Sequence, residues 1–180
     1  MLFWGLPAWN GSDRFGKIPL IGRNWTVQAG LQTRRALAGM RRRRQPDALF
    51  FHTQVTAILL PDWVKRFPSI LSLDATPKQY DRLGAFYQHT PGPQWLEDAK
   101  WRLNQVCFRL ARRLVTWSEW ARHGLVDEYE IPPEKISVIP PGVDTGLWRG
   151  PVREDPRSGP VRILFVGGDL ERKGGRLLVE

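Results

Sequence analysis

Cysteine is almost absent from this sequence of 180 residues, in which Cys107 is the only one. A lone cysteine excludes a disulfide within the chain, and no cluster of candidate ligands has the spacing of a metal site. We therefore expect a protein of the reducing cytoplasm that requires no metal and no other cofactor.

Long apolar runs are also missing. No stretch reaches the ~18 to 20 residues that a membrane-spanning helix requires, and the opening residues 1–7 lack the charged start and the cleavage site of a secretion signal. Low-complexity tracts and internal repeats are absent, and the 42% hydrophobic and 25% charged residues are typical of a globular protein. The sequence predicts a soluble or peripheral protein of about one domain, at roughly 100 to 200 residues per domain.

Acidic residues are scarce near the N-terminus. Residues 1–50 hold nine basic residues against two acidic ones, which places +7 of the net charge of +9 there. The ordinary interpretation is a solvated helix C-terminus, because Arg34, Arg35 and Arg41 to Arg44 lie in or after a helix that we expect over residues 26–40. Contact with an anionic membrane is the alternative. No nucleic-acid motif accompanies the cluster, so we expect no nucleic-acid partner.

Short apolar runs alternate with helical patterns along the chain. We expect strands at residues 48–52, 69–73, 113–117, 135–139 and 161–166. We expect helices over residues 26–40, from Gln54 to about Pro61, and after Ser118, with a polar connection over 78–93. A further helix is expected through the stripe Leu96, Ala99, Leu103, Val106, Leu110 and Leu114, which Cys107 and Ala111 widen. Strands that end at Pro or Gly and alternate with helices predict an α/β fold with a parallel, helix-covered sheet.

In such sheets, ligands collect at the carboxyl ends of the strands. His52, Asp74, Ser118 and Asp144 occupy these positions in the expected sheet. Each has a structural alternative: His52 as a hydrogen-bonded strand-end residue, Asp74 as the cap of a turn, and Ser118 as a helix N-cap, which is the expected role.

A glycine-rich block follows the last expected strand. Gly167 and Gly168 form the expected turn, and Arg172 and Lys173 follow at the expected entrance of a helix. Backbone amides at such a turn point toward a diphosphate, to which Lys173 adds one charge and Arg172 a second. For Lys173, the alternative is an exposed surface cation.

Five blocks together resemble retaining GT-B glycosyltransferases of the family 4, or group 1, type. Two lie at the domain junction, ISVIPPGVD at 136–144 and VRILFVGGDLERKG at 161–174, and three lie earlier, FFHTQ at 50–54, SLDATPKQYD at 72–81 and TWSEWA at 116–121. The resemblance implies a partial GT-B fold with Rossmann-like sheets. It divides the chain into an acceptor-side domain over residues 1–148, a linker over 149–160 and the start of a nucleotide-sugar domain over 161–180.

The resemblance also implies a reaction, the transfer of a hexose from a nucleotide diphosphate sugar to an acceptor glycan or lipid, with retention and without a metal. The implied donor-binding residues are Gly167, Gly168, Arg172 and Lys173, and the catalytic candidates are Asp74 and His52. Asp74 lies where relatives place a His or Asp at the sugar-facing end of a strand.

The chain departs from the family pattern in two respects. Many relatives carry Gly-Arg after the strand, where this chain has Gly167-Gly168, and neither the acidic Glu-x7-Glu motif nor the Gly-rich loop of the first domain is present. We therefore expect a fragment, truncated at both ends, without transferase activity of its own. The alternatives are a non-catalytic basic α/β module that binds an anionic membrane surface, at the inner membrane face, or a protein partner, and a small nucleic-acid binder.

Overall fold

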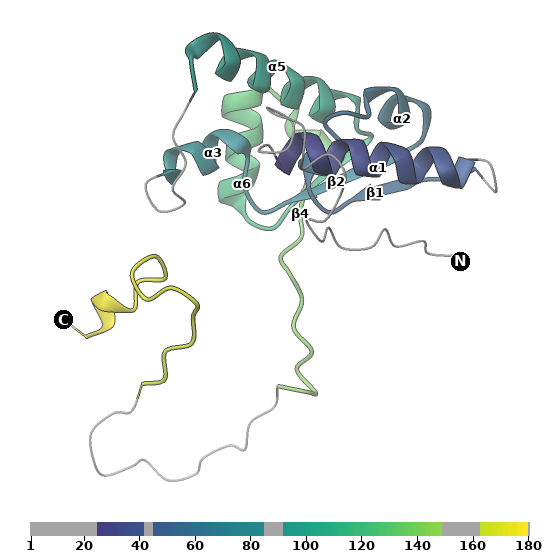
Figure 1. The fold of residues 1–180 in the computed structure, drawn as a ribbon. Helices are drawn as coiled ribbons and strands as arrows, with labels where there is room; N and C mark the ends of the chain where they lie inside the picture. The colour runs from purple at the N-terminus through teal and green to yellow at the C-terminus, as the bar shows by residue number, and fades with distance from the viewer. Residues whose placement is uncertain (1–24, 42–44, 85–91, 149–162, 180) are drawn as a thin grey trace. The chain divides into compact units, whose positions relative to one another are not determined.

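A computed structural model describes residues 25–41, 45–84, 92–148 and 163–179 of the chain (Figure 1). The chain divides into two compact units, Met1–Pro141 and Gly142–Glu180. The predicted domain boundaries at residues 148 and 160 stay predictions, and the linker predicted over 149–160 lies outside the described residues.

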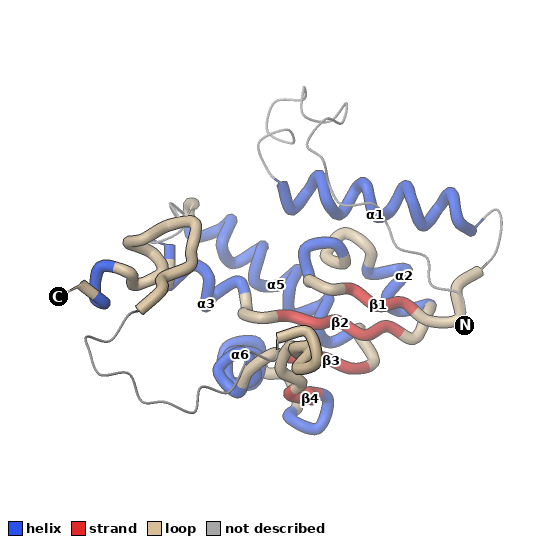
Figure 2. The backbone as a smooth tube through the Cα atoms, turned by 90° about the horizontal axis from the view of Figure 1, so that it is seen from below, coloured by secondary structure: helices blue, strands red, loops and turns tan. Residues whose placement is uncertain are grey.

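The first unit is built on a parallel sheet with the strand order β1-β2-β3-β4 (Figure 2). The strands are Leu49–Phe51 (β1), Ser69–Leu73 (β2), Arg113–Thr116 (β3) and Ile136–Val138 (β4). The helices are Trp25–Arg41 (α1), Pro61–Arg66 (α2), Pro77–Arg82 (α3), Gln94–Leu110 (α5) and Glu119–His123 (α6), with the short turns Gln54–Thr56 (η2), Gly124–Glu128 (η3, a π-helix) and Pro133–Lys135 (η4). This architecture confirms the predicted α/β fold, and each of the four strands lies within its predicted run.

Register separates the side chains of the sheet into two faces. One paired row is Phe51, Leu71, Leu114 and Ile136, and all of its members are buried. The row before it contains Phe50 and Ile70, which are 64% and 38% exposed. Because successive side chains of a strand alternate between faces, one face of the sheet forms the core and the other is open.

Helices α2 and α5 lie over the buried face of the sheet (Figures 1 and 2). Val64 of α2 and Phe108 of α5 share one core cluster with Leu71 and Leu114 of the strands. The ring of Phe108 meets the ring of Tyr129 edge to face, with 5.1 Å between the ring centroids. Burial of these apolar side chains is the main favourable contribution to the stability of the unit.

Helix α1 packs against the segment that precedes α2. A Cβ atom on Gly30 would lie 2.9 Å from Cγ of Leu59, so the glycine permits a close approach. The guanidinium of Arg34 donates hydrogen bonds to both carboxylate oxygens of Asp62, at 2.8 and 2.9 Å. The predicted helix is confirmed, but Arg34 docks it to α2 and is not merely solvated. Arg42 to Arg44 lie outside the described residues.

Two helical segments differ from the sequence predictions. The helix predicted from Gln54 to about Pro61 is wrong, because only the turn η2 forms and Pro61 begins α2. Proline is well accepted at the first helical position, where its missing N–H costs no hydrogen bond. The polar connection predicted over residues 78–93 is also wrong at its start, which is the helix α3. Residues 85–91 lie outside the described part of the chain.

The buried face of helix α5 overlaps only one edge of the predicted stripe. Cys107 and Ala111, at that edge, are buried with Asn104 and Phe108, whereas Leu103 and Val106 of the predicted stripe are about half exposed. The helix also ends before Leu114, which belongs to β3. The reason is that α5 carries apolar residues on two faces, and their periodicity does not tell which face meets the sheet.

The described residues of the second unit contain no strand. A strand was expected over 161–166, but residues 163–166 are irregular and lead into turns and the short η5 (Arg176–Leu178). A strand needs a hydrogen-bonded neighbour, and no described residue of this unit supplies one. Residues 161 and 162 lie outside the described residues.

Candidate functional site

The carboxyl ends of the four strands meet at one edge of the sheet, because all four strands are parallel. His52 follows β1, Asp74 follows β2, Trp117 follows β3 and Ile139 follows β4. This is the edge at which ligands bind in open parallel sheets. The structure therefore brings the two predicted catalytic residues to neighbouring strand ends.

His52 is exposed and is held against an aromatic ring. Its imidazole centroid lies 5.3 Å from the centroid of the Trp117 ring, with 43° between the planes. The indole Nε1 of Trp117 in turn donates a 3.0 Å hydrogen bond to Oγ of Ser72 on β2. The three side chains thus link β1, β3 and β2 across the strand ends, and they leave the imidazole open to a ligand.

A shallow hollow of about 520 Å³ lies beside His52. Its floor is the open face of the sheet, where Phe50, Ile70 and Val115 lie, and its rim carries His52 and Trp117. The lining is mainly apolar, and its polar groups are the imidazole, the Ser72 hydroxyl and the indole N–H. Such a surface favours an apolar body with a few polar edges.

Asp74 lies apart from this hollow and has its own partners. Its Oδ2 accepts a 2.7 Å hydrogen bond from the hydroxyl of Tyr80, and its Oδ1 accepts one of 3.0 Å from the backbone N–H of Ala75. Neither contact involves His52. The carboxylate is exposed and caps the turn into α3, so the structural alternative for Asp74 is present in the fold, and its catalytic role stays a prediction.

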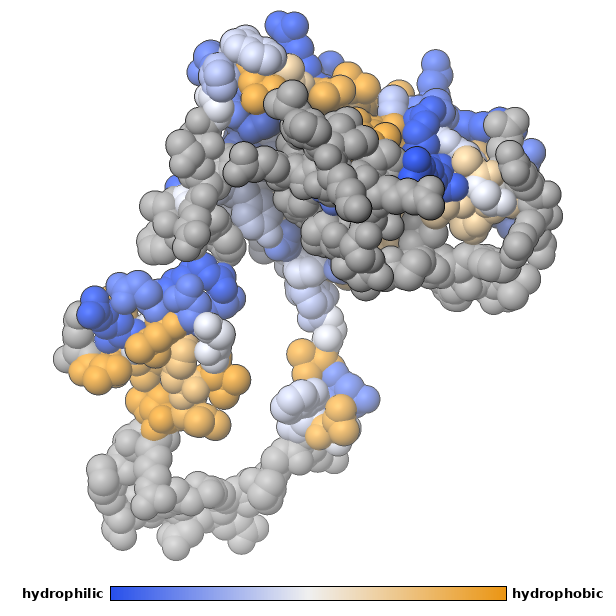
Figure 3. All heavy atoms as spheres, in the orientation of Figure 1, coloured by the Kyte–Doolittle hydropathy of each residue, from blue (hydrophilic) through white to orange (hydrophobic). Residues whose placement is uncertain are grey.

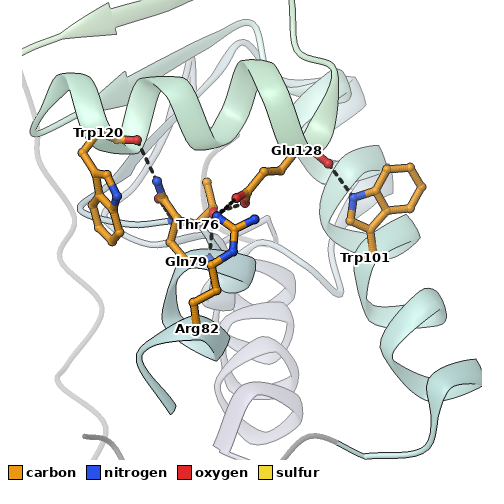
Figure 4. A network of polar contacts seen from close by, with 6 residues as sticks. All are labelled: Thr76, Gln79, Arg82, Trp101, Trp120 and Glu128. Carbon is orange, nitrogen blue, oxygen red and sulfur yellow. Dashed lines mark hydrogen bonds and ion pairs between the residues drawn. The ribbon is translucent and has the colours of Figure 1, made fainter. Parts of the chain in front are cut away.

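Helix α3, which follows Asp74, is fixed by a network of polar contacts (Figure 4). Thr76 and Gln79 form a reciprocal capping box. The Thr76 hydroxyl accepts a hydrogen bond from the backbone N–H of Gln79, and the side-chain carbonyl of Gln79 accepts one from the backbone N–H of Thr76. The carboxylate of Glu128 accepts a 3.2 Å hydrogen bond from the Thr76 hydroxyl and forms an ion pair with Arg82.

The same network continues through Glu128 to α5. Its backbone carbonyl accepts a 2.8 Å hydrogen bond from Nε1 of Trp101 (Figure 4). Sequence reasoning missed these residues, although Thr76-Pro-Lys-Gln79 has the spacing of a capping box and signals the start of α3. The partners from residues 101 and 128 are distant in sequence, and no local signal points to them.

Ser118 and Asp144 have structural roles. The Ser118 hydroxyl accepts a 3.2 Å hydrogen bond from the backbone N–H of Ala121, which confirms that Ser118 caps α6. In the second unit, Oδ1 of Asp144 accepts from the N–H groups of Gly146 and Leu147, at 2.9 and 3.2 Å. Both side chains therefore stabilise local turns.

The predicted diphosphate-binding residues lie within the second unit. Lys173 is exposed, while Arg172 is partly buried, with Nε 3.7 Å from Oδ2 of Asp169. Oδ1 of Asp169 also accepts a 3.0 Å hydrogen bond from the backbone N–H of Arg172. Asp169 thus contacts the backbone amide and the guanidinium of Arg172, and the prediction assigns that guanidinium to the diphosphate. The binding roles of Gly167, Gly168, Arg172 and Lys173 stay predictions.

No metal cluster accompanies these groups in the described chain: no three or more His, Cys, Asp and Glu side chains lie together as ligands. The thiol of Cys107 lies on the buried face of α5, and this burial raises its pKa from the ordinary 9.0 to about 12. A thiol with such a pKa is protonated at neutral pH, so Cys107 is a poor nucleophile and a packing residue.

Comparison with known proteins gives one family. The family model described as Glycosyltransferase Family 4 matches residues 7–147, which includes every strand of the sheet and both His52 and Asp74. No curated protein matches the chain.

Proposed function

Because the chain belongs to glycosyltransferase family 4, we propose that it is the acceptor-side part of a retaining hexosyltransferase that uses a nucleotide diphosphate sugar. The observation that carries the proposal is the family match over the whole sheet, combined with His52 and Asp74 at the ligand-binding edge. Glycosyl transfer is the activity of the family. Retention, the hexose, the nucleotide donor and an acceptor glycan or lipid belong to the proposal.

In this proposal, the strand ends of the first unit face the acceptor and the reacting sugar. The imidazole of His52 is exposed beside the ring of Trp117, an arrangement suited to a sugar hydroxyl above an aromatic surface. The carboxylate of Asp74 accepts the hydroxyl hydrogen of Tyr80, so it has a defined orientation at the next strand end. Both groups can accept a hydrogen bond from an acceptor hydroxyl.

The donor side is assigned to the second unit. The sugar leaves a diphosphate through an oxocarbenium-like transition state, so the main requirement is stabilisation of the leaving-group charge. Lys173, Arg172 and the amides around Gly167 and Gly168 supply positive charge without a metal. The contact of Arg172 with Asp169 would have to open for Arg172 to reach the diphosphate.

We further propose that this chain alone does not turn over a sugar nucleotide. Two observations support this. The described residues of the second unit include no strand on which a donor pocket could be built. Among the described residues of the first unit, one face of the parallel sheet is exposed at Phe50 and Ile70, whereas parallel sheets are ordinarily covered on both faces. The missing parts of the pocket would then come from further sequence.

The direct test is release of nucleoside diphosphate from UDP-, GDP- and ADP-sugars by the purified chain. We expect none, and turnover would contradict the inactivity of the chain. The two-part proposal itself is tested by sequencing the DNA on both sides of the reading frame. A Gly-rich loop upstream and a Glu-x7-Glu motif downstream are expected, and flanking frames without either motif would argue for a stand-alone binding module.

A further inference from the structure

Helix α5 presents a second apolar face away from the core. This outer face consists of Trp95, Leu96, Ala99, Leu103 and Val106, at steps of three and four residues from Leu96 onward, and it ends at Leu110, which is partly buried against the core. At about 100° per residue it is centred about a third of a turn from the core face. Leu103 and Val106 are 49% and 46% exposed, and apolar side chains gather over α5 (Figure 3).

We propose that the outer face of α5 is a contact surface for an anionic phospholipid membrane. The first argument is the end of the helix, where Trp95 is 71% exposed. A tryptophan with an apolar ring and a polar N–H is favoured at the boundary between lipid headgroups and acyl chains. With leucines along the same side, α5 has the residue pattern of a helix that lies in the membrane interface.

The second argument is the charge beside the outer face. Arg102 and Arg109 are exposed along one flank, where Arg109 also forms a 3.1 Å ion pair with Glu130, and Arg112 and Arg113 are exposed just beyond the end of the helix. Residues 94–113 hold five basic residues against two acidic ones, a local charge of +3. Basic side chains next to an apolar face attract anionic headgroups and orient the apolar side chains toward the bilayer.

The same charges disfavour a second copy of the chain as the occupant. Leu96, Leu103 and Leu110 are seven residues apart, as in a coiled-coil seam, so self-pairing through this face must be considered. The residues that flank such a seam are Arg102 and Arg109 on one side and Lys100 on the other. Lys100 pairs with Glu97 and Arg109 with Glu130 in the same chain, so two copies would bring these basic flanks together without gaining a new acidic partner at the flanking positions.

The test is sedimentation of the full chain with two kinds of vesicle, phosphatidylcholine alone and an equal mixture with phosphatidylglycerol. We expect binding to the mixed vesicles that weakens with added salt, and little binding to phosphatidylcholine. The double variant Leu103→Gln/Val106→Gln and the double variant Arg102→Gln/Arg109→Gln should each lower the partition coefficient by about tenfold or more. Circular dichroism should show retained folding, since all four side chains are exposed or half exposed.

Matched controls change similar residues elsewhere. Leu177→Gln removes another exposed leucine, and Lys65→Gln/Arg66→Gln removes two charges from α2, and both should bind like the parent chain. Replacing Arg41 to Arg44 by Gln tests the N-terminal cluster. Loss of vesicle binding by this variant, while the α5 variants bound like the parent chain, would overturn the proposal. So would the absence of binding to anionic vesicles, or a dimer that Leu103→Gln/Val106→Gln abolishes. Vesicle binding needs no sugar nucleotide, so the proposal is tested independently of transferase function.

Discussion

The side-chain amide of Gln79 donates a 2.7 Å hydrogen bond to the backbone carbonyl of Trp120, which lies 41 residues further along the chain. The side-chain carbonyl oxygen of Gln79 accepts a 2.9 Å hydrogen bond from the backbone N–H of Thr76. Both ends of the amide are therefore fixed, and Gln79 is only 3% exposed. One buried side chain ties α3, and with it the turn that carries Asp74, to α6.

This contact predicts that Gly124→Ala destabilises the fold. A Cβ atom at Gly124 would lie 2.6 Å from the amide carbon and nitrogen of Gln79, which cannot move without loss of its two hydrogen bonds. We expect a loss of about 1 to 3 kcal/mol in the free energy of unfolding, measured by urea denaturation. The control is Gly39→Ala in α1, where nothing lies within 4 Å and stability should rise by up to about 1 kcal/mol. An equal response of the two variants would argue against the role of Gln79.

The alternation of the sheet predicts a small effect on stability for one phenylalanine and a large one for its neighbour. Phe50→Lys places a charge on the open face and should change stability by less than about 1 kcal/mol, because the side chain stays in water. Phe51→Lys places the charge among core residues and should cost about 4 kcal/mol or more. Circular dichroism with urea denaturation measures both effects.

Phe50→Lys also tests whether the open face causes aggregation. Phe50→Lys should shift the chain toward monomer in size-exclusion chromatography, since it removes an exposed apolar ring from the hollow. A parent chain that is already monomeric and melts sharply would show that the open face does not cause aggregation.

The sequence was sufficient for the sheet but not for the packing of its helices. Ser69–Leu73 is a short apolar run with a proline before it and Asp74 after it. The strands that pair with it, β1 and β3, are short apolar runs of the same kind. In α5, by contrast, Leu103 and Asn104 are adjacent, and the polar one is buried. Its Nδ2 donates to the carbonyl of Lys100, a contact that lowers the cost of burial and that hydrophobic periodicity does not reveal.

The candidate site shows the same division. His52 and Asp74 were placed at strand ends because the carboxyl end of a parallel strand follows directly from the sequence order. The contacts that orient them are of two kinds. Tyr80 lies six residues from Asp74 and is within reach of local reasoning, whereas the chain from His52 through Trp117 to Ser72 joins three strands and depends on the register.

Burial of Cys107 predicts a fall in stability at alkaline pH. The pKa of the folded thiol is raised to about 12 by desolvation, while the unfolded thiol ionises near its ordinary value of 9.0. Between these values the unfolded chain binds fewer protons, so the free energy of unfolding falls as pH rises, by up to about 1.4 kcal/mol per pH unit for this group. Burial also raises the pKa of Tyr129, which adds a fall of the same sign, whereas the lowered pKa of Lys135 acts in the opposite direction.

Cys107→Ala isolates the contribution of the thiol. The variant should lose stability at neutral pH, because a packed sulfur is removed, but its free energy of unfolding should decline less steeply above about pH 9. Urea denaturation at several pH values measures the slope, and a thiol reagent should label the parent chain only when urea is present. Rapid labelling of the folded chain would show that Cys107 is accessible.

The position of Asp169 predicts that removing its carboxylate strengthens phosphate binding by the second unit. Its two oxygens occupy the Arg172 amide and guanidinium, which a diphosphate would otherwise contact. Asp169→Ala removes both of these contacts and a negative charge that repels phosphate, so we expect pyrophosphate to bind about tenfold more tightly in calorimetry. Lys173→Ala should weaken binding in both backgrounds. Glu171→Ala is the matched control, because it removes one negative charge from the same turn, from a carboxylate that lies 3.6 Å from Arg176. If Glu171→Ala strengthens binding as much as Asp169→Ala does, net charge alone explains the effect, and the assignment of the Arg172 amide and guanidinium to the diphosphate fails.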